Sequence, residues 1–268
     1  MTTKLRPPRS APPPKAVPPA PPSPDEEEGG ARMTFLDHLN ELRIRITRAA
    51  LALVIGTVIG FALADPVLNY LLAPYGDRLQ VLEPTGTVVS YFRVALLIGG
   101  VLSIPLTTYQ LLMFIFPALT RKEKRYLLLA LPAITLLFVA GAIFAWLALV
   151  PPALDFLENF QSDIFFVQWE ADSYLGFVTA LVFWMGVASE TPLIFFVLSL
   201  LGLVGPMVLL KNWRVAVVGS GVAAAMITPT IDPVNMFLVM GPLLTLYAFS
   251  IILTAIGRRI SRVEPTAP

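Results

Sequence analysis

Six apolar segments, each bounded by polar residues, account for most of the chain beyond residue 48. They cover residues 49–64, 94–116, 126–149, 174–201, 215–227 and 236–256. A helix needs roughly 20 apolar residues to cross a hydrocarbon core of about 30 Å, and the second, third, fourth and sixth segments are that long. The first gains length from the turn at Thr47, and the fifth is short, at about 20 Å. The pattern predicts an all-α membrane protein with six transmembrane helices.

The segment before the first span, residues 34–48, has the periodicity of a short amphipathic helix. Thr34 can cap its amino terminus, and apolar residues recur every three or four positions. This apolar stripe consists of Leu36, Leu39, Leu42 and Ile46. The polar groups are those of Asp37, Glu41, Arg43, Arg45 and Arg48. We expect an interfacial helix that lies along the membrane surface with these charges in water.

Composition supports a membrane protein and excludes several kinds of site. The chain is 56% hydrophobic and 14% charged, whereas soluble domains have about 25% charged residues. It has no cysteine, and His38 is its single histidine. Disulfides, thiolate metal sites and haem sites with several histidines are therefore excluded, and we expect no cofactor. The net charge of +1 gives no reason to expect a nucleic-acid partner.

The two ends of the chain differ from its apolar centre. Residues 1–32 contain ten prolines and an acidic run at 25–28. Such a composition cannot build a core and predicts a disordered, proline-rich cytoplasmic tail. We divide the chain into this tail, a six-span membrane domain over residues 33–260 and a cytoplasmic carboxy-terminal tail over 261–268.

The basic residues gather in alternate connections between the spans. Seventeen of the nineteen lysines and arginines lie before the first span or after the second, fourth or sixth, and the other two are Arg78 and Arg93. The loop after the third span holds five acidic residues and no cation. Because positively charged loops stay in the cytoplasm, we expect both termini to be cytoplasmic.

Glu190 lies inside the fourth apolar segment, and no cation within the apolar segments can neutralise it. Burying a carboxylate there costs several kcal/mol unless it is protonated or reaches polar groups. Four interpretations stay open. Glu190 could be a neutral acid bonded to carbonyls freed by Pro192, a proton relay, a substrate site or a docking point for a polar group of another helix.

Two further carboxylates lie in cation-rich settings on the predicted cytoplasmic face. Glu123 stands among four basic residues after the second span, and Glu41 is spaced to pair with Arg45 one turn later. Each alone is explained by a solvated charge paired with its neighbours. Together, however, two carboxylates can receive guanidinium groups bidentately.

The fifth span combines its short length with small residues. Gly219 and Gly221 leave a face that a second helix can approach closely, either from within this chain or from a partner. Prolines interrupt the longer spans, where they kink helices and leave concave faces. They are Pro105, Pro132, Pro192 and Pro242.

Three ordered stretches of the sequence resemble signatures of TatC, the multi-spanning subunit of the twin-arginine protein translocase. The first is His-Leu-Asn-Glu-Leu-Arg-Ile-Arg at 38–45, the second covers 109–124, and the third covers 186–192 with Glu190. The turn at 228–232, with Asp232, is similar to the family's periplasmic turn after the fifth span. The resemblance covers about residues 33–260 and leaves out the proline-rich tail.

The resemblance implies a concave, glove-like bundle that binds the Arg-Arg signal peptides of folded precursors on its cytoplasmic face. It implies that Glu41 and Glu123 contact the paired arginines. The other residues that it implies on the same face are Leu39, Arg43, Phe114 and Lys124.

The resemblance also implies partners, an energy source and a location. Glu190 meets a polar group of a TatA-type helix, and the fifth span docks a TatB-type helix at Gly219, Gly221 and Met226. The subunits form a multimeric complex in contact with membrane lipid, and export is driven by the proton motive force, so no enzymatic activity is expected. We expect the cytoplasmic (inner) membrane of a prokaryote. A thylakoid origin fits the same topology, although the acidic run at 25–28 is unlike a transit peptide.

A proton-coupled small-solute transporter with Glu190 as its relay is the alternative function. Such transporters are built from inverted repeats with paired broken helices, and this sequence has no two halves of similar pattern. An intramembrane hydrolase would need a nucleophile–base pair or a metal constellation, and we find neither in the sequence.

Overall fold

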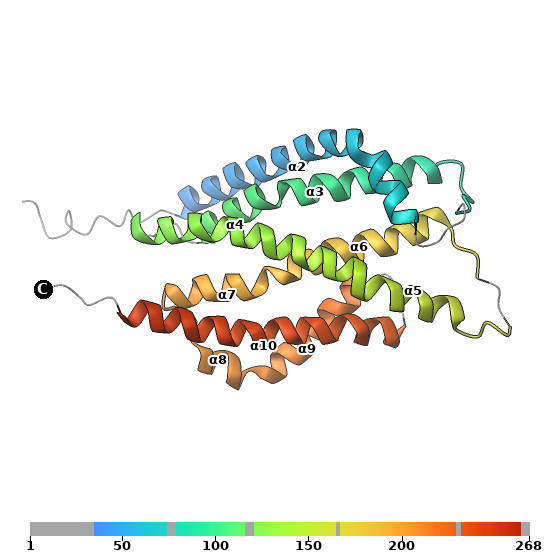
Figure 1. The fold of residues 1–268 in the computed structure, drawn as a ribbon. Helices are drawn as coiled ribbons and strands as arrows, with labels where there is room; N and C mark the ends of the chain where they lie inside the picture. Colours follow the sequence, from blue (N-terminus) through green and yellow to red (C-terminus); the bar gives the residue numbers. More distant parts are fainter. Residues whose placement is uncertain (1–34, 74–78, 116–120, 165–166, 229–231, 264–268) are drawn as a thin grey trace, which may run out of the picture.

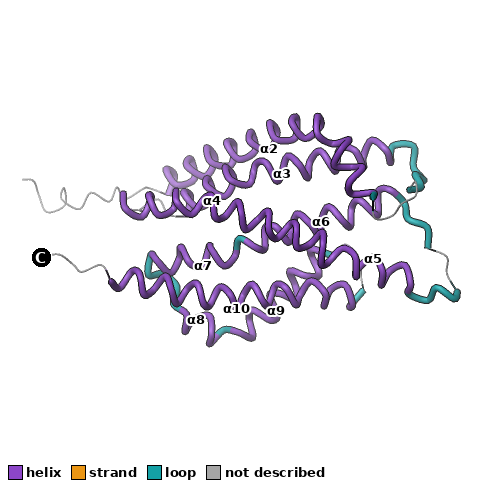
Figure 2. The backbone as a smooth tube through the Cα atoms, in the orientation of Figure 1, coloured by secondary structure: helices purple, strands orange, loops and turns teal. Residues whose placement is uncertain are grey.

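The computed structural model of the chain describes residues 35–73, 79–115, 121–164, 167–228 and 232–263 (Figure 1). Within those ranges the chain is helical, with one isolated bridge between Gln80 and Glu170 and no strand (Figure 2). Five helical stretches are long and apolar enough to cross a membrane, and a sixth has only 15 residues. The all-α fold class with a short fifth span is therefore confirmed, whereas the predicted tail over 1–32 lies outside the described residues.

The first span is a single helix, α2 (Phe35–Leu72), of 38 residues. At 1.5 Å per residue it is about 57 Å long and extends well beyond a hydrocarbon core of ~30 Å. The predicted interfacial segment over 34–48 is helical from Phe35, but it is the start of the span rather than a separate helix. Between Phe35 and Gly56 the chain has no glycine or proline, so nothing in the sequence ends the helix at the end of the predicted interfacial segment.

The second helix, α3 (Gly86–Ile115), packs along α2 at very short range. A Cβ atom on Gly60 of α2 would stand 2.3 Å from the carbonyl oxygen of Ala95 on α3. A Cβ on Gly56 would meet the backbone of Gly99 in the same way, at 2.7 Å. The absence of side chains at these positions lets the two backbones approach and forms the hairpin of the first two spans.

The third span continues further than predicted. α4 (Arg121–Phe144) leads through a π-helical turn (Ala145–Leu149) into α5 (Val150–Asn159). Pro151 and Pro152 lack backbone donors at the start of α5, and the wider π turn before them accommodates their rings without ending the helix. The first part of the expected acidic loop is therefore helical.

The fourth span is interrupted in its middle, where Figure 2 shows a short loop between α6 (Ala171–Ser189) and α7 (Thr191–Leu200). Glu190 is the residue between them, and Pro192 lies in the first turn of α7. The other three interior prolines predicted from the sequence lie within continuous helices. They are Pro105, Pro132 and Pro242.

The remaining helices are α8 (Pro206–Lys211), α9 (Trp213–Ile227) and α10 (Pro233–Val263). In Figure 1, α2 and α3 lie uppermost, α4 and α6 in the middle, and α7 to α10 below. α6 is the centre of the main core, in which Tyr174, Leu181 and Met185 are almost completely buried. The starts of α2 and α4 and the end of α10 lie at one end of the bundle (Figure 1). We call this the α2/α4 end.

Candidate functional site

The first turns of α2 meet the last turn of α3 at the α2/α4 end. The rings of His38 and Phe114 stack there, with centroids 4.5 Å apart and planes inclined by 13°. His38 lies one turn before Glu41 on α2, so this contact places the predicted site residue Phe114 near Glu41. The sequence did not indicate a role for His38, whose only signal was its place in the first signature.

Glu41 forms an ion pair with Arg45 one turn later on α2. Arg45 Nε and Nη2 both donate to Glu41 Oε1, the first at 2.9 Å, and Arg45 Nη1 donates to Oε1 of Gln110 on α3 at 3.4 Å. The side chains of Glu41 and Arg45 are only 17% and 15% exposed, which corrects the expectation that they lie in water. Glu41 Oε2 is buried and accepts no hydrogen bond from the described residues.

This arrangement leaves Glu41 able to accept a further donor. One oxygen is engaged by Arg45 and the other is a buried acceptor, which a second guanidinium would reach through the adjoining cavity. A cavity of about 310 Å³ adjoins it. Its lining residues are Asp37, Asn40, Glu41, Ile44, Arg45 and Arg48.

The apolar stripe of the amino-terminal helix faces away from α3. Leu36, Leu39 and Ile46 are 74%, 44% and 58% exposed, and Arg43 is exposed as well. Apolar side chains on the outer face of a helix suit a lipid environment, where they gain little from facing another helix. Leu39 and Arg43 therefore lie on the outer face of α2, away from the Glu41–Arg45 pair.

The other two residues predicted at this face begin α4. Glu123 and Lys124 lie in its first turn, at the same end of the bundle as the start of α2 (Figure 1). Their side chains lie outside the described part of the structure.

Glu190 is buried, at 5% exposure, in the interruption between α6 and α7. Its Oε2 accepts a hydrogen bond from Thr108 Oγ1 on α3 at 3.1 Å, and its Oε1 has no partner among the described residues. One interpretation of the sequence bonded Glu190 to backbone carbonyls freed by Pro192. In the structure, Glu190 is instead bonded to the hydroxyl of Thr108. Thr108 was missed because a threonine within an apolar segment gives no signal of its partner.

A large apolar groove runs along α9, bordered by α6, α7, α8 and α10. Its volume is about 700 Å³, and both Gly219 and Met226 line it. A Cβ on Gly219 would meet no atom within 4 Å, and Met226 is 79% exposed. Gly221 does not line the groove and faces α10, where a Cβ would contact Met240 Sδ at 3.9 Å. The predicted docking residues therefore lie on two sides of α9.

Asp232 caps the start of α10. Its Oδ1 accepts a hydrogen bond from the backbone N–H of Asn235 at 2.7 Å, and its Oδ2 accepts one from Asn235 Nδ2 at 3.0 Å. An aspartate three residues before the bonded N–H is a standard amino-terminal cap. A capping role accounts for Asp232 without a ligand.

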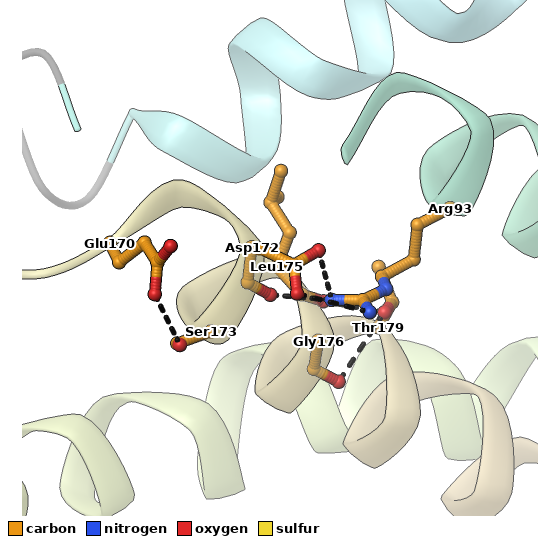
Figure 3. Close-up of polar contacts among 7 residues, drawn as sticks. All are labelled: Arg93, Glu170, Asp172, Ser173, Leu175, Gly176 and Thr179. Atoms are coloured by element: carbon orange, nitrogen blue, oxygen red, sulfur yellow. Dashed lines mark hydrogen bonds and ion pairs between the residues drawn. The ribbon is translucent and has the colours of Figure 1, made fainter. Parts of the chain in front are cut away.

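Arg93, one of the two cations outside the basic connections, is paired. Figure 3 shows its guanidinium reaching the first turn of α6, where Nη1 lies 3.0 Å from Asp172 Oδ1 and also bonds the Asp172 carbonyl oxygen. A Cβ on Gly176 would stand 2.5 Å from the same nitrogen, so that glycine makes room for the arginine. The pair joins α3 to α6 at the end of the bundle opposite to Glu41 (Figure 1).

Comparisons with known proteins place the chain in context. A sequence profile described as Sec-independent protein translocase protein (TatC) matches residues 37–242. The chain is 36% identical over 224 residues to a Synechocystis sp. protein named Sec-independent protein translocase protein TatC, which covers 83% of the chain and 88% of that protein. It is 37% identical over 219 residues to the chloroplastic protein TATC of Pisum sativum, over 80% of the chain and 62% of that protein.

A solved structure shares the fold. The crystal structure titled Twin Arginine Translocase Receptor TatC superimposes with a TM-score of 0.73 and 34% sequence identity. The match covers 82% of this chain and 99% of that one.

Within the described residues, no group of three or more acidic or histidine side chains could hold a metal ion.

Proposed function

The chain belongs to the TatC family of Sec-independent protein translocases, and we propose that it is the receptor subunit that binds the paired arginines of a signal peptide through Glu41 and Glu123. The family is a non-enzymatic translocase component. The protein is therefore a multi-pass membrane subunit that acts in a complex with other Tat subunits. Membership of this family favours the translocase function over the alternative, a proton-coupled small-solute transporter.

The geometry of Glu41 carries the proposal. The Glu41 carboxylate is held by Arg45, which is itself bonded to Gln110 on α3, so a guanidinium that binds Glu41 loses less conformational freedom than at a mobile surface side chain. Its Oε2, without a partner among the described residues, is the acceptor that an incoming arginine requires. Glu123 in the first turn of α4 supplies the second acceptor.

In this proposal the α2/α4 end faces the cytoplasm and both chain termini are cytoplasmic. Seventeen of the nineteen basic residues support that orientation. Arg93 is the exception within the described residues, and Asp172 partly neutralises it. The location is the inner membrane of a prokaryote, and precursors are exported at the expense of the proton motive force.

We assign two further positions to partner helices. The groove along α9 receives a TatB-type helix, since α9 is only 15 residues long and its wall at Gly219 is free of side chains. Glu190 Oε1 accepts a hydrogen bond from a polar group of a TatA-type helix, because that atom is buried without a partner in the described structure. Satisfying such a group stabilises the assembled complex.

Photo-cross-linking to a signal peptide tests the receptor site. An Arg-Arg signal peptide that carries a photoreactive residue beside the arginines should label the wild-type protein, and Glu41→Ala and Glu123→Ala should each reduce the labelling. Glu158→Ala, at an exposed acid on α5, is the matched control and should leave it unchanged. Equal labelling of all four proteins would refute the proposed site, as would equal labelling by a peptide without the arginines.

A further inference from the structure

A cavity with two arginines in an otherwise apolar lining lies at the α2/α4 end, on the side of the bundle formed by α8 and α10 (Figure 1). It lies between the turn that connects α7 to α8 and the last turns of α10, and its volume is about 360 Å³. Its lining residues are Gly205, Pro206, Met207, Val208, Ala255, Arg258 and Arg259. Neither the signal-peptide site nor the groove along α9 accounts for its two adjacent arginines.

The position of Arg258 is fixed by its surroundings. A Cβ on Gly205 would stand 3.0 Å from Arg258 Cζ, so the guanidinium lies flat against the backbone of the α7–α8 turn. α10 is itself held against α7 next to this point, where Ser199 Oγ donates to the carbonyl oxygen of Thr254 at 2.7 Å. A Cβ on Gly257 would stand 3.0 Å from the same hydroxyl. The cavity wall is therefore a packed structure rather than a mobile side chain.

The charge and the rim of the cavity indicate the chemistry of its ligand. Arg259 is exposed, and no described carboxylate forms an ion pair with it. Beside the two cations, the rim exposes the apolar side chains of Met207 and Val208, at 61% and 53%. A cationic cavity with an apolar rim at the end of a membrane helix matches an anionic lipid headgroup and its acyl chains. Free phosphate would contact the arginines but would leave the apolar rim without a partner.

We propose that this cavity binds the phosphate group of an anionic phospholipid. Arg258 and Arg259 contact the phosphate, and the acyl chains lie along Met207 and Val208. The bound lipid would join the α7–α8 turn to the end of α10 and thereby support α8, which leads into the groove along α9. This proposal requires nothing of the signal-peptide site and stands or falls separately from it.

Native mass spectrometry of the purified full-length protein tests the proposal. The protein in detergent is titrated with phosphatidylglycerol and, in parallel, with phosphatidylcholine, and the bound lipid is counted. Each arginine near an anionic headgroup contributes about five-fold to affinity, so Arg259→Gln should weaken phosphatidylglycerol binding about five-fold and the double variant Arg258→Gln/Arg259→Gln roughly 25-fold. Phosphatidylcholine should bind weakly to every variant.

Two controls make the outcome decisive. Arg214→Gln removes the same charge from the start of α9, outside the cavity, where Arg214 lies over the ring of Trp213, and it should bind lipid as the wild type does. Arg258→Lys/Arg259→Lys keeps the charge and should retain most of the binding. Unchanged binding by Arg259→Gln, or an equal loss in Arg214→Gln, would overturn the proposal. Displacement of the lipid by inorganic phosphate would also overturn it, by showing that the cavity binds free phosphate.

Discussion

Thr108 on α3 donates a hydrogen bond to Glu190 Oε2, 3.1 Å away, at the interruption between α6 and α7. The bond joins the second span to the fourth at the point where the fourth has lost its helical continuity. Both side chains are buried, at 5% exposure each. A hydrogen bond in such a place stabilises the bundle because neither group can turn to water instead.

We expect Thr108→Val to destabilise the protein without changing its shape. Valine has nearly the size of threonine but cannot donate to Glu190, so the free energy of unfolding should fall by about 1 kcal/mol. Unfolding in detergent measures the difference. Thr107→Val, one position earlier on the same helix, is the control and should change stability less. An equal effect of both variants would show that the bond contributes nothing specific.

Glu190→Gln should retain export, whereas Glu190→Ala should not. The glutamine carbonyl can accept the hydrogen from Thr108, and its NH2 group can donate to a partner hydroxyl, which accepts as well as donates, but glutamine cannot ionise. Alanine removes both interactions. Export of an Arg-Arg precursor into membrane vesicles measures the outcome. Loss of export in both variants would instead indicate proton exchange at Glu190.

Arg45→Gln should lower the affinity for a signal peptide. Arg45 bonds both Glu41 and Gln110 of α3, so without it the carboxylate that receives the peptide arginine is no longer held in position. Partly exposed ion pairs contribute about 0.2–1 kcal/mol, so binding should weaken about 1.4- to five-fold. Fluorescence anisotropy of a labelled Arg-Arg peptide measures the affinity. Tighter binding would show that Arg45 competes with the peptide for Glu41 and does not position it.

Gly60→Ala should separate the first two helices. The new Cβ would stand 2.3 Å from the carbonyl oxygen of Ala95, and a backbone atom cannot move aside as a flexible side chain would. We expect a loss of about 1–3 kcal/mol in the free energy of unfolding. Gly219→Ala makes the same chemical change on α9 where a Cβ meets no atom within 4 Å, and it should not destabilise the protein. Equal stability of the two variants would contradict the close approach.

The sequence predicted the spans well because lipid imposes their length and composition. The short fifth span was predicted from an apolar run of only 13 residues, and α9 has 15. The ends of the other helices were predicted poorly. Nothing in hydrophobicity marks where a helix ends once it has left the membrane, so the extensions of α2 to Leu72 and of the third span to Asn159 could not be predicted.

The candidate site was predicted in part, for a different reason. A carboxylate within an apolar run is conspicuous, so Glu190 was found from the sequence. Its partner Thr108, 82 residues earlier, became apparent only when the helices were placed side by side. The charges of Glu41 and Arg45 were predicted to lie in water, because the sequence does not show that the start of α2 packs beside α3. Leu36, Leu39 and Ile46 face outward as an interfacial stripe would, but Arg45 bonds Glu41 and Gln110 of α3, and both charged side chains are largely buried.

Filling the groove along α9 should block the partner helix and leave the subunit itself intact. A Cβ on Gly219 meets no atom within 4 Å, so Gly219→Leu adds its side chain to the groove without a clash in this chain. The leucine occupies space that a docked helix needs, because close helix contacts in membranes depend on small residues. We expect cross-linking to a TatB-type subunit to fall about tenfold, which corresponds to a loss of ~1.4 kcal/mol in binding.

The matched control for this prediction is Gly241→Leu on α10. Gly241 also has no atom within 4 Å of its Cβ position, but it lines a different cavity, between α4, α6, α7 and α10, of about 660 Å³. Both variants should unfold at the wild-type temperature, and Gly241→Leu should cross-link as the wild type does. Loss of cross-linking in Gly241→Leu alone would show that the partner helix docks in the cavity beside α4 and not in the groove along α9. Wild-type cross-linking in both variants would remove both surfaces as docking sites, since neither could then be filled by a helix.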